Sequence, residues 1–392
     1  MTLRTMGDAV SAWKAPFLRY ERHLSAAAMV AGFAVDNFAF GRVDHPGAHI
    51  VFIGYLAVAV LSIALGHAVR ARRDREQAKL AALREKENAR ATSDETPLPP
   101  KRSRLGLWMR AATQFALGGL WSGFLVFYSR SAVLAASWPF LLLLLCFLIG
   151  NEAFRHYHSR LVFASLLLFF ALYSYAVFVV PVFTKTLGLV TFVASGVLAC
   201  GAFFLFLHLL RKIDRARYAQ SRWKLIGGAL AIVVAMNAFY FTGILPPLPL
   251  ALSDVGIYHE IHREGAVYQA QGENEPLAAR LGLARPVIHV VPGEKLALYS
   301  AVFAPIKMTT RISHRWQWWN ARAGSWQTQS IVSFQIAGGR DRGYRAYSLK
   351  SDPRAGDWRV DIDSADGRLI GRLGFAVVPV VSQPAMVAKT LS

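Results

Sequence analysis

Long apolar runs separated by short polar connections fill most of the first 250 residues and restrict what this chain can fold into. Each of seven runs has about the length of ~20 residues that an α-helix needs to cross a hydrocarbon core of ~30 Å. Their approximate limits are 24–40, 49–68, 107–128, 133–149, 161–180, 187–210 and 225–245. The runs predict an α-helical membrane bundle of about seven transmembrane helices over residues 24–250.

The connection 69–104 lies between the second and third runs and sets the direction of the bundle. Its Lys and Arg residues are Arg70, Arg72, Arg73, Arg75, Lys79, Arg84, Lys86, Arg90, Lys101, Arg102 and Arg104. A loop this basic stays cytoplasmic, because moving its charges across a bilayer is costly. We therefore expect the basic leader 1–23 to be cytoplasmic and, after seven crossings, the C-terminal domain to lie outside.

A formal net charge of +20 is typical of nucleic-acid-binding proteins, but the distribution of the charge does not favour that function. Much of the Lys and Arg sits in connections that flank apolar runs, which the positive-inside rule explains without phosphate binding. Anionic membrane lipids are the expected partners of these connections. The two cysteines, Cys146 and Cys200, both lie inside apolar runs. They predict small packing residues rather than a disulfide or a metal site.

From residue 285 the pattern changes to alternation of apolar and polar residues, which is typical of half-buried strands. Candidate strands are 287–291, 296–303, 311–319, 328–337, 344–350, 357–363 and 368–378. Asp366-Gly367 predicts a tight hairpin between the last two. These strands predict an all-β, immunoglobulin-like sandwich over 285–380. An amphipathic connector is expected over 251–284 and a tail over 381–392.

Two groups of short motifs stand out. In the helical part they are Gly32-Phe33 with Asp36, Arg42-x-Asp44, Phe124–Ser131, Gly150-Asn151-Glu152, Pro246-Pro247-x-Pro249-Leu250 and Gly256–His259. In the C-terminal part they are His314-Arg315-Trp316, Gly338-Gly339-Arg340, Gly343-Tyr344-Arg345 and Gly356–Val360. Together they resemble an uncharacterised bacterial multi-pass inner-membrane family whose chains end in an exported domain of unknown function. The resemblance implies this architecture, with a periplasmic C-terminal domain, and no activity, substrate or catalytic residue.

Asp36 lies inside the first apolar run, where a carboxylate is costly and suggests either a function or a charge pair. Arg42 and Arg130, at the outer ends of the first and third spans, are the expected partners of a structural pair. The alternative is a proton relay in transport. Because transport usually needs more than one such group and the later spans offer few, we favour the structural pair.

His259 and His262, three residues apart on an expected helix, and His314 in strand 311–319 are candidate zinc ligands. The spacing of the first two is not the i, i+4 pattern of metalloproteases. His314 also shares its strand face with Ile312 and Trp316, which indicates a hydrogen-bonded core histidine. We therefore expect no metal and no other cofactor.

Exposed tryptophans near arginines form a candidate binding surface for a periplasmic protein or a glycan. Its members are Trp319, Trp326, Arg340, Arg342 and Arg345. Strand alternation predicts that Trp316 and Trp318 are core while Trp319 faces outward. The alternative is that all the tryptophans belong to the core and the arginines form a solvated rim.

Two functions follow from these features. The first is a non-catalytic integral inner-membrane protein whose periplasmic sandwich binds an envelope component or a partner protein. The second is a transporter of a small solute or lipid, or a membrane-embedded enzyme, that uses Asp36. The scarcity of ionisable groups in the spans favours the first. Gly119-x-x-x-Gly123 and the pair Gly196 and Cys200 predict close helix packing, within one protomer or between copies in a homo-oligomer.

Overall fold

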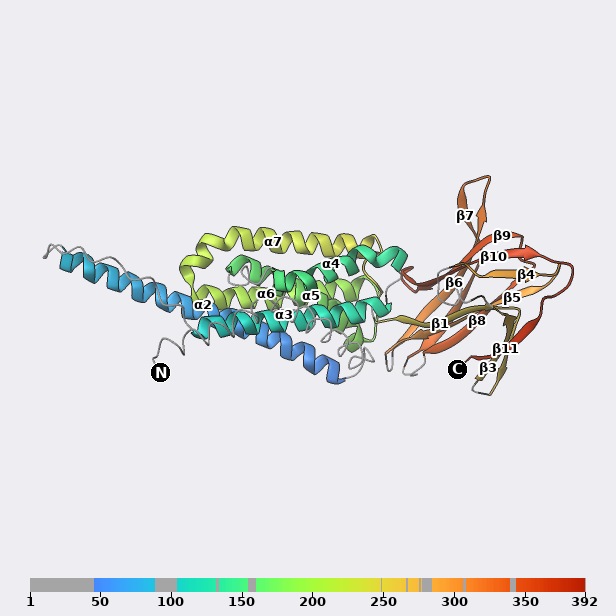
Figure 1. Ribbon diagram of the computed structural model, residues 1–392, viewed down its shortest axis with the longest axis horizontal. Helices are drawn as coiled ribbons and strands as arrows, with labels where there is room; N and C mark the ends of the chain where they lie inside the picture. Colours follow the sequence, from blue (N-terminus) through green and yellow to red (C-terminus); the bar gives the residue numbers. More distant parts are fainter. Residues whose placement is uncertain are drawn as a thin grey trace, which may run out of the picture. The chain divides into compact units, whose positions relative to one another are not determined.

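The computed structural model describes residues 46–88, 104–131, 134–153, 160–247, 249–265, 267–274, 276, 284–305, 308–338 and 343–391. Within these ranges, helices come first and strands follow (Figure 1). The helices are α2 (Pro46–Asn88), α3 (Arg104–Ser131), α4 (Leu134–Ala153), α5 (Leu161–Thr184), α6 (Leu189–Ile213) and α7 (Arg215–Phe241). The strands are β1 (Ala251–Tyr258), β2 (Glu260–Glu264), β3 (Val267–Glu273), β4 (Val287–Val290), β5 (Lys295–Phe303), β6 (Thr309–Asn320), β7 (Ser325–Ala337), β8 (Tyr344–Ser351), β9 (Gly356–Ser364), β10 (Leu369–Pro379) and β11 (Met386–Leu391).

The described part of the chain has six helices where the sequence predicts seven spans. The first expected span, 24–40, lies outside the described residues. Each of the other expected spans overlaps one of the helices α2 to α7, although α2 continues 20 residues beyond its expected span and α7 begins ten residues before its own. Four described helices are long and apolar enough to cross a membrane: Gly47–Leu83 within α2, then α5, α6 and α7. The apolar stretch Ala136–Asn151 within α4 is shorter.

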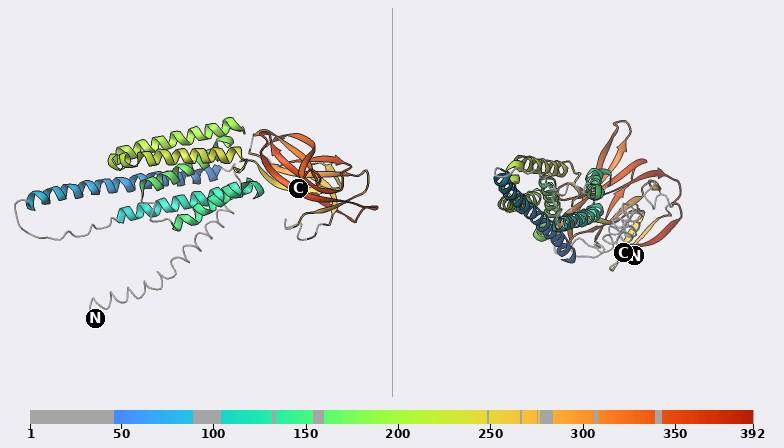
Figure 2. Two further views of the ribbon diagram at one scale, coloured as in Figure 1. Left: turned by 90° about the horizontal axis from the view of Figure 1, so that it is seen from above. Right: turned by 60° about the vertical axis from the view of Figure 1, so that its left-hand side comes forward.

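The second expected span continues without a break into the charged connection. Helix α2 contains 43 residues, and its charged second half is rich in good helix formers. Its long course is clear in the view from above (Figure 2). Asp74 in this charged half accepts a hydrogen bond of 2.6 Å from Arg217 at the start of α7. The helix is therefore tied to a second basic connection by an ion pair.

Small residues in α3 receive aromatic rings from α2. A Cβ atom at Gly119 would lie 2.5 Å from the ring of Tyr55, and one at Gly123 would lie 2.5 Å from the ring of Phe52. Those distances are shorter than real Cβ contacts, so any other residue at either position would force the ring to shift. The Gly119-x-x-x-Gly123 motif thus works within the protomer, where it lets two helices approach closely.

The chain forms two compact units. One contains the described residues up to Phe127 with Leu143–Leu172 and Ala202–Ala229, and the other contains Tyr128–Leu142, Tyr173–Gly201 and the chain from Leu230 onward. All the strands belong to the second unit.

The β domain has three sheets. The largest has the strand order β4-β10-β9-β6-β7, and two three-stranded sheets have the orders β1-β5-β8 and β11-β3-β2. Among the described residues, neighbouring strands pair antiparallel except for β10 and β4, which are parallel. One core lies between the five-stranded sheet and β1-β5-β8, where Leu298 of β5 meets Trp316 of β6, Trp358 of β9 and Phe375 of β10. The expected two-sheet sandwich is therefore present.

A third layer covers the other face of β1-β5-β8. Tyr258 of β1 and Tyr299 of β5 pack there against Ile261 of β2, Ala270 of β3 and Leu391 of β11. Strand β5 is consequently buried on both faces from Leu296 to Phe303. The prediction of an amphipathic connector over 251–284 and of a tail over 381–392 was wrong, because β1, β2, β3 and β11 form there. In β1, β2 and β3 the short apolar alternation was mistaken for the apolar face of a helix.

The β9–β10 hairpin confirms the turn that Asp366-Gly367 predicts. Gly367 has a φ of 77°, a left-handed value that glycine adopts without the strain a Cβ would add. The Ser364 hydroxyl contacts an Asp366 carboxylate oxygen at 2.5 Å and closes the turn. The hairpin holds β9 beside β10, and β9 also pairs with β6.

Candidate functional site

The outer face of the five-stranded sheet, which points away from the core, collects charged side chains from three neighbouring strands. Because side chains alternate along a strand, burial of Ile312, His314 and Trp316 on the inner face places Arg315 on the outer face of β6. Arg315 stands opposite Asp361 of β9. Asp361 in turn stands opposite Arg372 of β10. Opposite charges therefore alternate across the sheet.

These groups form a tight ion-pair network. Arg372 binds Asp361 through two hydrogen bonds, Nε to Oδ1 at 2.5 Å and Nη2 to Oδ2 at 2.9 Å. Nη2 of Arg315 lies 2.7 Å from Oδ2 of Asp363 and 3.7 Å from Oδ2 of Asp361. Asp361 is only 2% exposed and Asp363 only 5%. Buried carboxylates of this kind are tolerated because each has a charged partner.

Burial has a stronger effect than the ion pair on the pKa of Asp363. Burial raises the pKa of Asp363 to about 6, and the nearby Arg315 only partly opposes this effect. A close ion pair alone would lower that pKa, so desolvation is the stronger influence here. The pKa of Arg372 is raised, chiefly by its hydrogen bonds to Asp361. Arg372 and Asp361 thus form the stable pair, while Asp363 is the less satisfied carboxyl.

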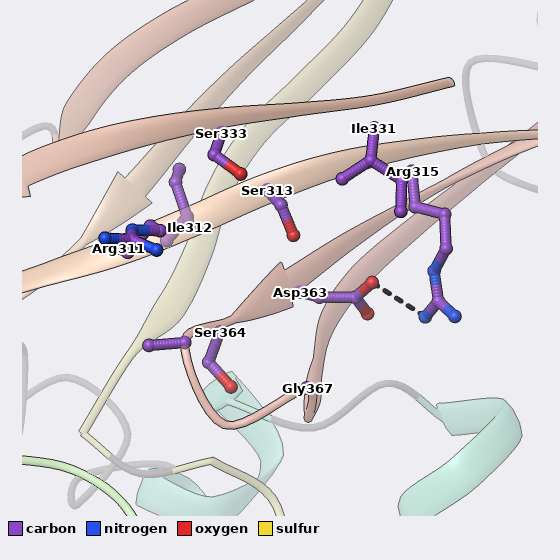
Figure 3. A pocket seen from close by; sticks show the side chains of 10 residues that line it. Arg311, Ile312, Ser313, Arg315, Ile331, Ser333, Asp363, Ser364 and Gly367 are labelled. Carbon is purple, nitrogen blue, oxygen red and sulfur yellow. Dashed lines mark ion pairs between the residues drawn. The ribbon is translucent and has the colours of Figure 1, made fainter.

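A pocket opens beside Asp363, with a volume of about 330 Å³ (Figure 3). Its walls come from β6, β7 and the β9–β10 hairpin, and its lining residues are Arg311, Ile312, Ser313, Arg315, Ile331, Ser333, Asp363, Ser364, Ala365 and Gly367. Among the described residues, Oδ1 of Asp363 and Nε of Arg315 are buried and have no hydrogen-bond partner. An unmet acceptor and an unmet donor in one ion pair are costly unless something occupies the pocket.

A second feature of the same face is an aromatic pair. The rings of Trp319 and Trp326 lie 5.3 Å apart on paired strands, and the Arg359 guanidinium lies 4.5 Å over the Trp326 ring. Arg359 also donates a hydrogen bond of 2.8 Å from Nε to the Gln317 side chain. Part of each ring is therefore covered by its neighbours, which leaves less free aromatic surface than the sequence predicts.

The structure separates the predicted tryptophan–arginine surface. Trp319 and Trp326 lie opposite each other near the turn of the β6–β7 hairpin. Arg345 lies in β8, on a different sheet, with its guanidinium 5.7 Å from the Tyr268 ring. The expectation that Arg345 joins the tryptophans therefore fails, because the chain crosses to the other sheet between β7 and β8. Arg340 and Arg342 lie outside the described residues.

The three candidate histidines occupy different environments. His262 is exposed on β2, and its Nε2 lies 2.9 Å from Glu260. His314 is fully buried and contacts Ser300 at 2.8 Å and Ser348 at 2.9 Å, which bridges the two core sheets. His314 is thus a hydrogen-bonded core residue, as its strand pattern indicates. Across the part of the chain that the structure describes, no group of three or more His, Cys, Asp or Glu side chains has an arrangement suited to a metal.

His259 follows β1 in a strand region rather than in the expected helix. Its Nδ1 lies 2.6 Å from Glu294 and its Nε2 lies 3.1 Å from Glu273. Glu273 also accepts hydrogen bonds from the backbone and the ring of His289, at 2.6 and 2.7 Å. Burial would raise the pKa of Glu273, but these hydrogen bonds outweigh burial and lower the pKa. These hydrogen bonds join β3 and β4 to the end of β1, which indicates a structural role for the cluster.

Replacing His314 by glutamine is expected to remove one source of acid sensitivity. Burial lowers the pKa of His314 from 6.5 to about 4. Below pH 6.5 the unfolded chain therefore binds a proton at this residue that the folded chain does not bind until about pH 4. The unfolding free energy consequently decreases as the pH falls towards 4. Relative to His314→Gln, the wild type should lose about 3 kcal/mol of unfolding free energy across this window. Denaturant titrations of the full chain in detergent at several pH values measure it, and a pH-independent difference would contradict the assignment.

The expected membrane charge pair lies mostly beyond the described residues. Asp36 and Arg42 both fall outside them. Arg130 belongs to α3, but its side chain is not among those described. The pairing of Asp36 with either arginine stays a prediction.

Sequence reasoning missed the pocket residues, although part of their signal was visible. Arg359, Asp361 and Asp363 alternate with buried residues along β9, and Arg311 and Arg315 do the same along β6. Such alternation places charges on one strand face. Only the strand order β10-β9-β6-β7 brings those faces together.

The fold and the pocket define a class: a helical region followed by an all-β domain with a polar pocket on one sheet face. Residues 309–377 match the family model described as "Protein of unknown function (DUF2914)". The C-terminal part of the chain is thus similar to this domain of unknown function, and the matched segment contains every residue that lines the pocket. The match agrees with the sequence resemblance to a C-terminal domain of unknown function.

Two further comparisons add little. No curated protein matches the chain. An immunoglobulin-like protein from Pseudomonas aeruginosa is 11% identical, with a TM-score of 0.18, over 32% of this chain and 97% of that chain. A Pseudomonas fluorescens alkylpurine DNA glycosylase bound to DNA with an abasic-site analogue is 12% identical, with a TM-score of 0.18, over 84% and 99%. Scores this low carry no argument about function.

Proposed function

We propose that this chain is a non-catalytic, multi-pass protein of the bacterial inner membrane whose β domain binds an envelope component or a partner protein. Four helices long and apolar enough to cross a membrane support the anchor. The basic residues of connection 69–104 support a cytoplasmic N-terminal side, and the C-terminal β domain is then periplasmic.

One observation carries the binding role. Oδ1 of Asp363 and Nε of Arg315 are buried beside a pocket of about 330 Å³ and lack partners among the described residues. Buried polar atoms are nearly always paired, and the exceptions gather where a ligand or water completes them. A pocket of this size with a few converging polar groups has the character of a small binding site.

The orientation and the binding face are tested together by cysteine labelling of the full chain. Cys146 and Cys200 are first replaced by alanine, and single cysteines are introduced at Ser333 on the pocket rim, Val381 beyond β10 and Glu76 in the charged half of α2. In cells with a permeabilised outer membrane, a bulky membrane-impermeant maleimide should label the first two positions and spare Glu76→Cys. Labelling of Glu76→Cys alone would reverse the topology.

The labelled proteins then test binding. Reconstituted in nanodiscs, the unlabelled protein should bind saturably to at least one purified fraction: cell-wall glycan, outer-membrane vesicles or soluble periplasmic protein. The label at Ser333→Cys should abolish that binding because it fills the pocket. The label at Val381→Cys, a side chain that is 99% exposed and does not line the pocket, should leave binding unchanged. Binding that survives the Ser333 label would exclude this face as the site.

A further inference from the structure

We propose that the free edge of β7 binds an extended segment of a partner protein whose residues alternate between acidic and apolar. This inference rests on the proposed binding function and names the class of partner. β7 lies at one end of the strand order β4-β10-β9-β6-β7, and β6 is the one described strand that pairs with it. Figure 1 shows the β6–β7 hairpin projecting from the rest of the β domain. The backbone groups on the far side of β7 can therefore form hydrogen bonds with an added strand.

The edge of β7 lacks the features that usually keep an exposed edge strand from pairing. Such strands are short, or they contain charged residues or proline. β7 runs for 13 residues, from Ser325 to Ala337, with no charged residue and no proline. Among the other described edge strands, β4 has only four residues, and the rest carry charges: Asp254 in β1, Glu260 in β2, Lys350 in β8 and Lys389 in β11. β7 is thus the described edge most open to strand addition.

The hydrogen-bond pattern indicates which backbone groups of β7 face its free edge. The Gly338 N–H donates a hydrogen bond of 2.7 Å to the Met308 carbonyl, and this pair continues the register of β6 and β7. Along an antiparallel ladder, pairs that exchange hydrogen bonds alternate with pairs whose backbone groups point outward. The outward-facing residues are therefore Ile331, Ser333 and Gln335. The register shifts at Gln329, so the regular edge is Ser330–Ala337.

The inner face of this edge requires apolar residues in the partner. Val332 and Phe334 lie on the core side of the sheet, opposite His314 and Ile312, yet both are only half-buried. Burial of their remaining apolar surface against a neighbouring strand is favourable. The side chains of the added strand that lie on the inner face are therefore apolar.

The outer face requires acidic residues, because the hairpin is basic. The segment Thr309–Ala337 contains three arginines, Arg311, Arg315 and Arg322, and no aspartate or glutamate. Arg315 is paired with Asp363, whereas Arg311 and Arg322 are exposed and form no ion pair within the part of the chain that the structure describes. An added strand lies two strand spacings, about 10 Å, from β6. An extended arginine and a glutamate side chain together span that distance.

The same charge disfavours a second copy of this chain as the partner. Two β7 edges in antiparallel contact would bring together two basic hairpins, neither of which contains a carboxylate side chain. Like charges at short range repel, whereas opposite charges favour encounter and fix the register of a complex. An acidic segment of another protein is therefore the preferred occupant.

The inference is tested with the full chain in nanodiscs on an array of peptides as long as the regular edge. The peptides have glutamate at alternate positions and valine, isoleucine or tyrosine between them, and we expect a subset to bind saturably. Replacing their glutamates by lysine should weaken binding at least tenfold. Arg311→Gln should weaken it about threefold, the effect of losing one exposed ion pair. Lys295→Gln removes the charge of an exposed residue in another sheet and should bind as the wild type does.

A backbone substitution tests strand addition itself. Gln335→Pro removes an outward N–H group but no hydrogen bond to β6, and edge strands tolerate proline at such a position. Gln335→Pro should bind at least tenfold more weakly than Gln335→Ala, which retains the N–H group, while the two variants melt at similar temperatures. Hydrogen exchange gives an independent readout on the wild type. Bound peptide should slow exchange in segment 330–337 and leave it unchanged in β8, the edge of another sheet.

Other results would overturn the inference. Equal binding of the glutamate and lysine peptides, or unchanged exchange in segment 330–337, would exclude strand addition. Competition by inorganic phosphate without a change in exchange would make the pocket an anion site. A dimer that Gln335→Pro dissociates would assign the edge to a second copy. If no peptide binds while the Ser333→Cys label still blocks capture of an envelope fraction, the partner class is wrong and the binding function stands. Capture of no fraction would contradict the function itself.

Discussion

Replacing Trp358 by alanine is expected to remove about 3–5 kcal/mol from the unfolding free energy of the β domain, the usual cost of deleting a buried aromatic ring. Trp358 is 1% exposed and lies at the centre of the main core. Its ring meets that of Trp316 edge-on at 6.5 Å, and its indole N–H donates to the Arg354 carbonyl at 2.7 Å. The substitution therefore leaves a cavity and an unpaired carbonyl. A domain of ordinary stability would be largely unfolded by a loss of this size.

The measurement is a thermal melt of the full chain in detergent, followed by near-ultraviolet circular dichroism of the tryptophans. Trp319→Ala is the matched control, because Trp319 lies on the outer face of the sheet, where its ring packs against that of Trp326. It should leave the melt nearly unchanged. A Trp319→Ala protein that melts as early as Trp358→Ala would place Trp319 in the core and remove it from any binding surface.

Replacing Asp361 by asparagine should cost about 3 kcal/mol, at the lower end of the range for breaking a buried ion pair. Asp361 is 2% exposed and holds Arg372 through two hydrogen bonds, with Arg315 close by. The substitution leaves these two guanidinium groups with Asp363 as the nearest carboxyl. The lower end applies because both arginine side chains are about one-third exposed and can turn partly to water.

Denaturant titration of the full chain measures this loss, with Asp357→Asn as the control. Asp357 lies on the same strand and face, but its side chain is 47% exposed and its ion pair with Arg285 is long, at 3.9 Å. Its removal should change stability by no more than about 0.5 kcal/mol. Adding Arg372→Gln to Asp361→Asn should recover part of the loss, because it removes one of the orphaned charges. Equal effects of Asp361→Asn and Asp357→Asn would mean that the network contributes little.

The helices and the strands β4 to β10 could largely be predicted from the sequence, because the patterns that indicate them are local. An apolar run of about 20 residues indicates one helix, and a strict alternation of apolar and polar residues indicates one strand. Neither pattern depends on the rest of the chain. The seven candidate strands all formed, and α2 ran on into its charged half as its helix-forming residues indicate. Strands β1, β2 and β3 were missed because they are short and bury mostly against one another and β5, so their local pattern resembles that of an amphipathic helix.

The candidate site depended on information that no single segment contains. His314 was correctly interpreted, because its neighbours Ile312 and Trp316 mark one strand face as core. Arg345 was grouped with Trp319 by closeness in sequence, yet the crossing from β7 to β8 carries it to another sheet. Asp361, Asp363 and Arg315 were placed on strands but not beside one another, since pairing between β6 and β9 joins residues about fifty positions apart.

The sequence by itself determined the class of this protein: a helical region with long apolar helices and a basic connection, followed by an all-β domain with the Asp366-Gly367 hairpin. These features follow from hydrophobic periodicity, charge and turn chemistry, which act over a few neighbouring residues. Only the tertiary structure decided the strand order, the third sheet and the pocket. That is because Oδ1 of Asp363 and Nε of Arg315 become a buried, unmet pair only when β6, β7 and the β9–β10 hairpin pack around them.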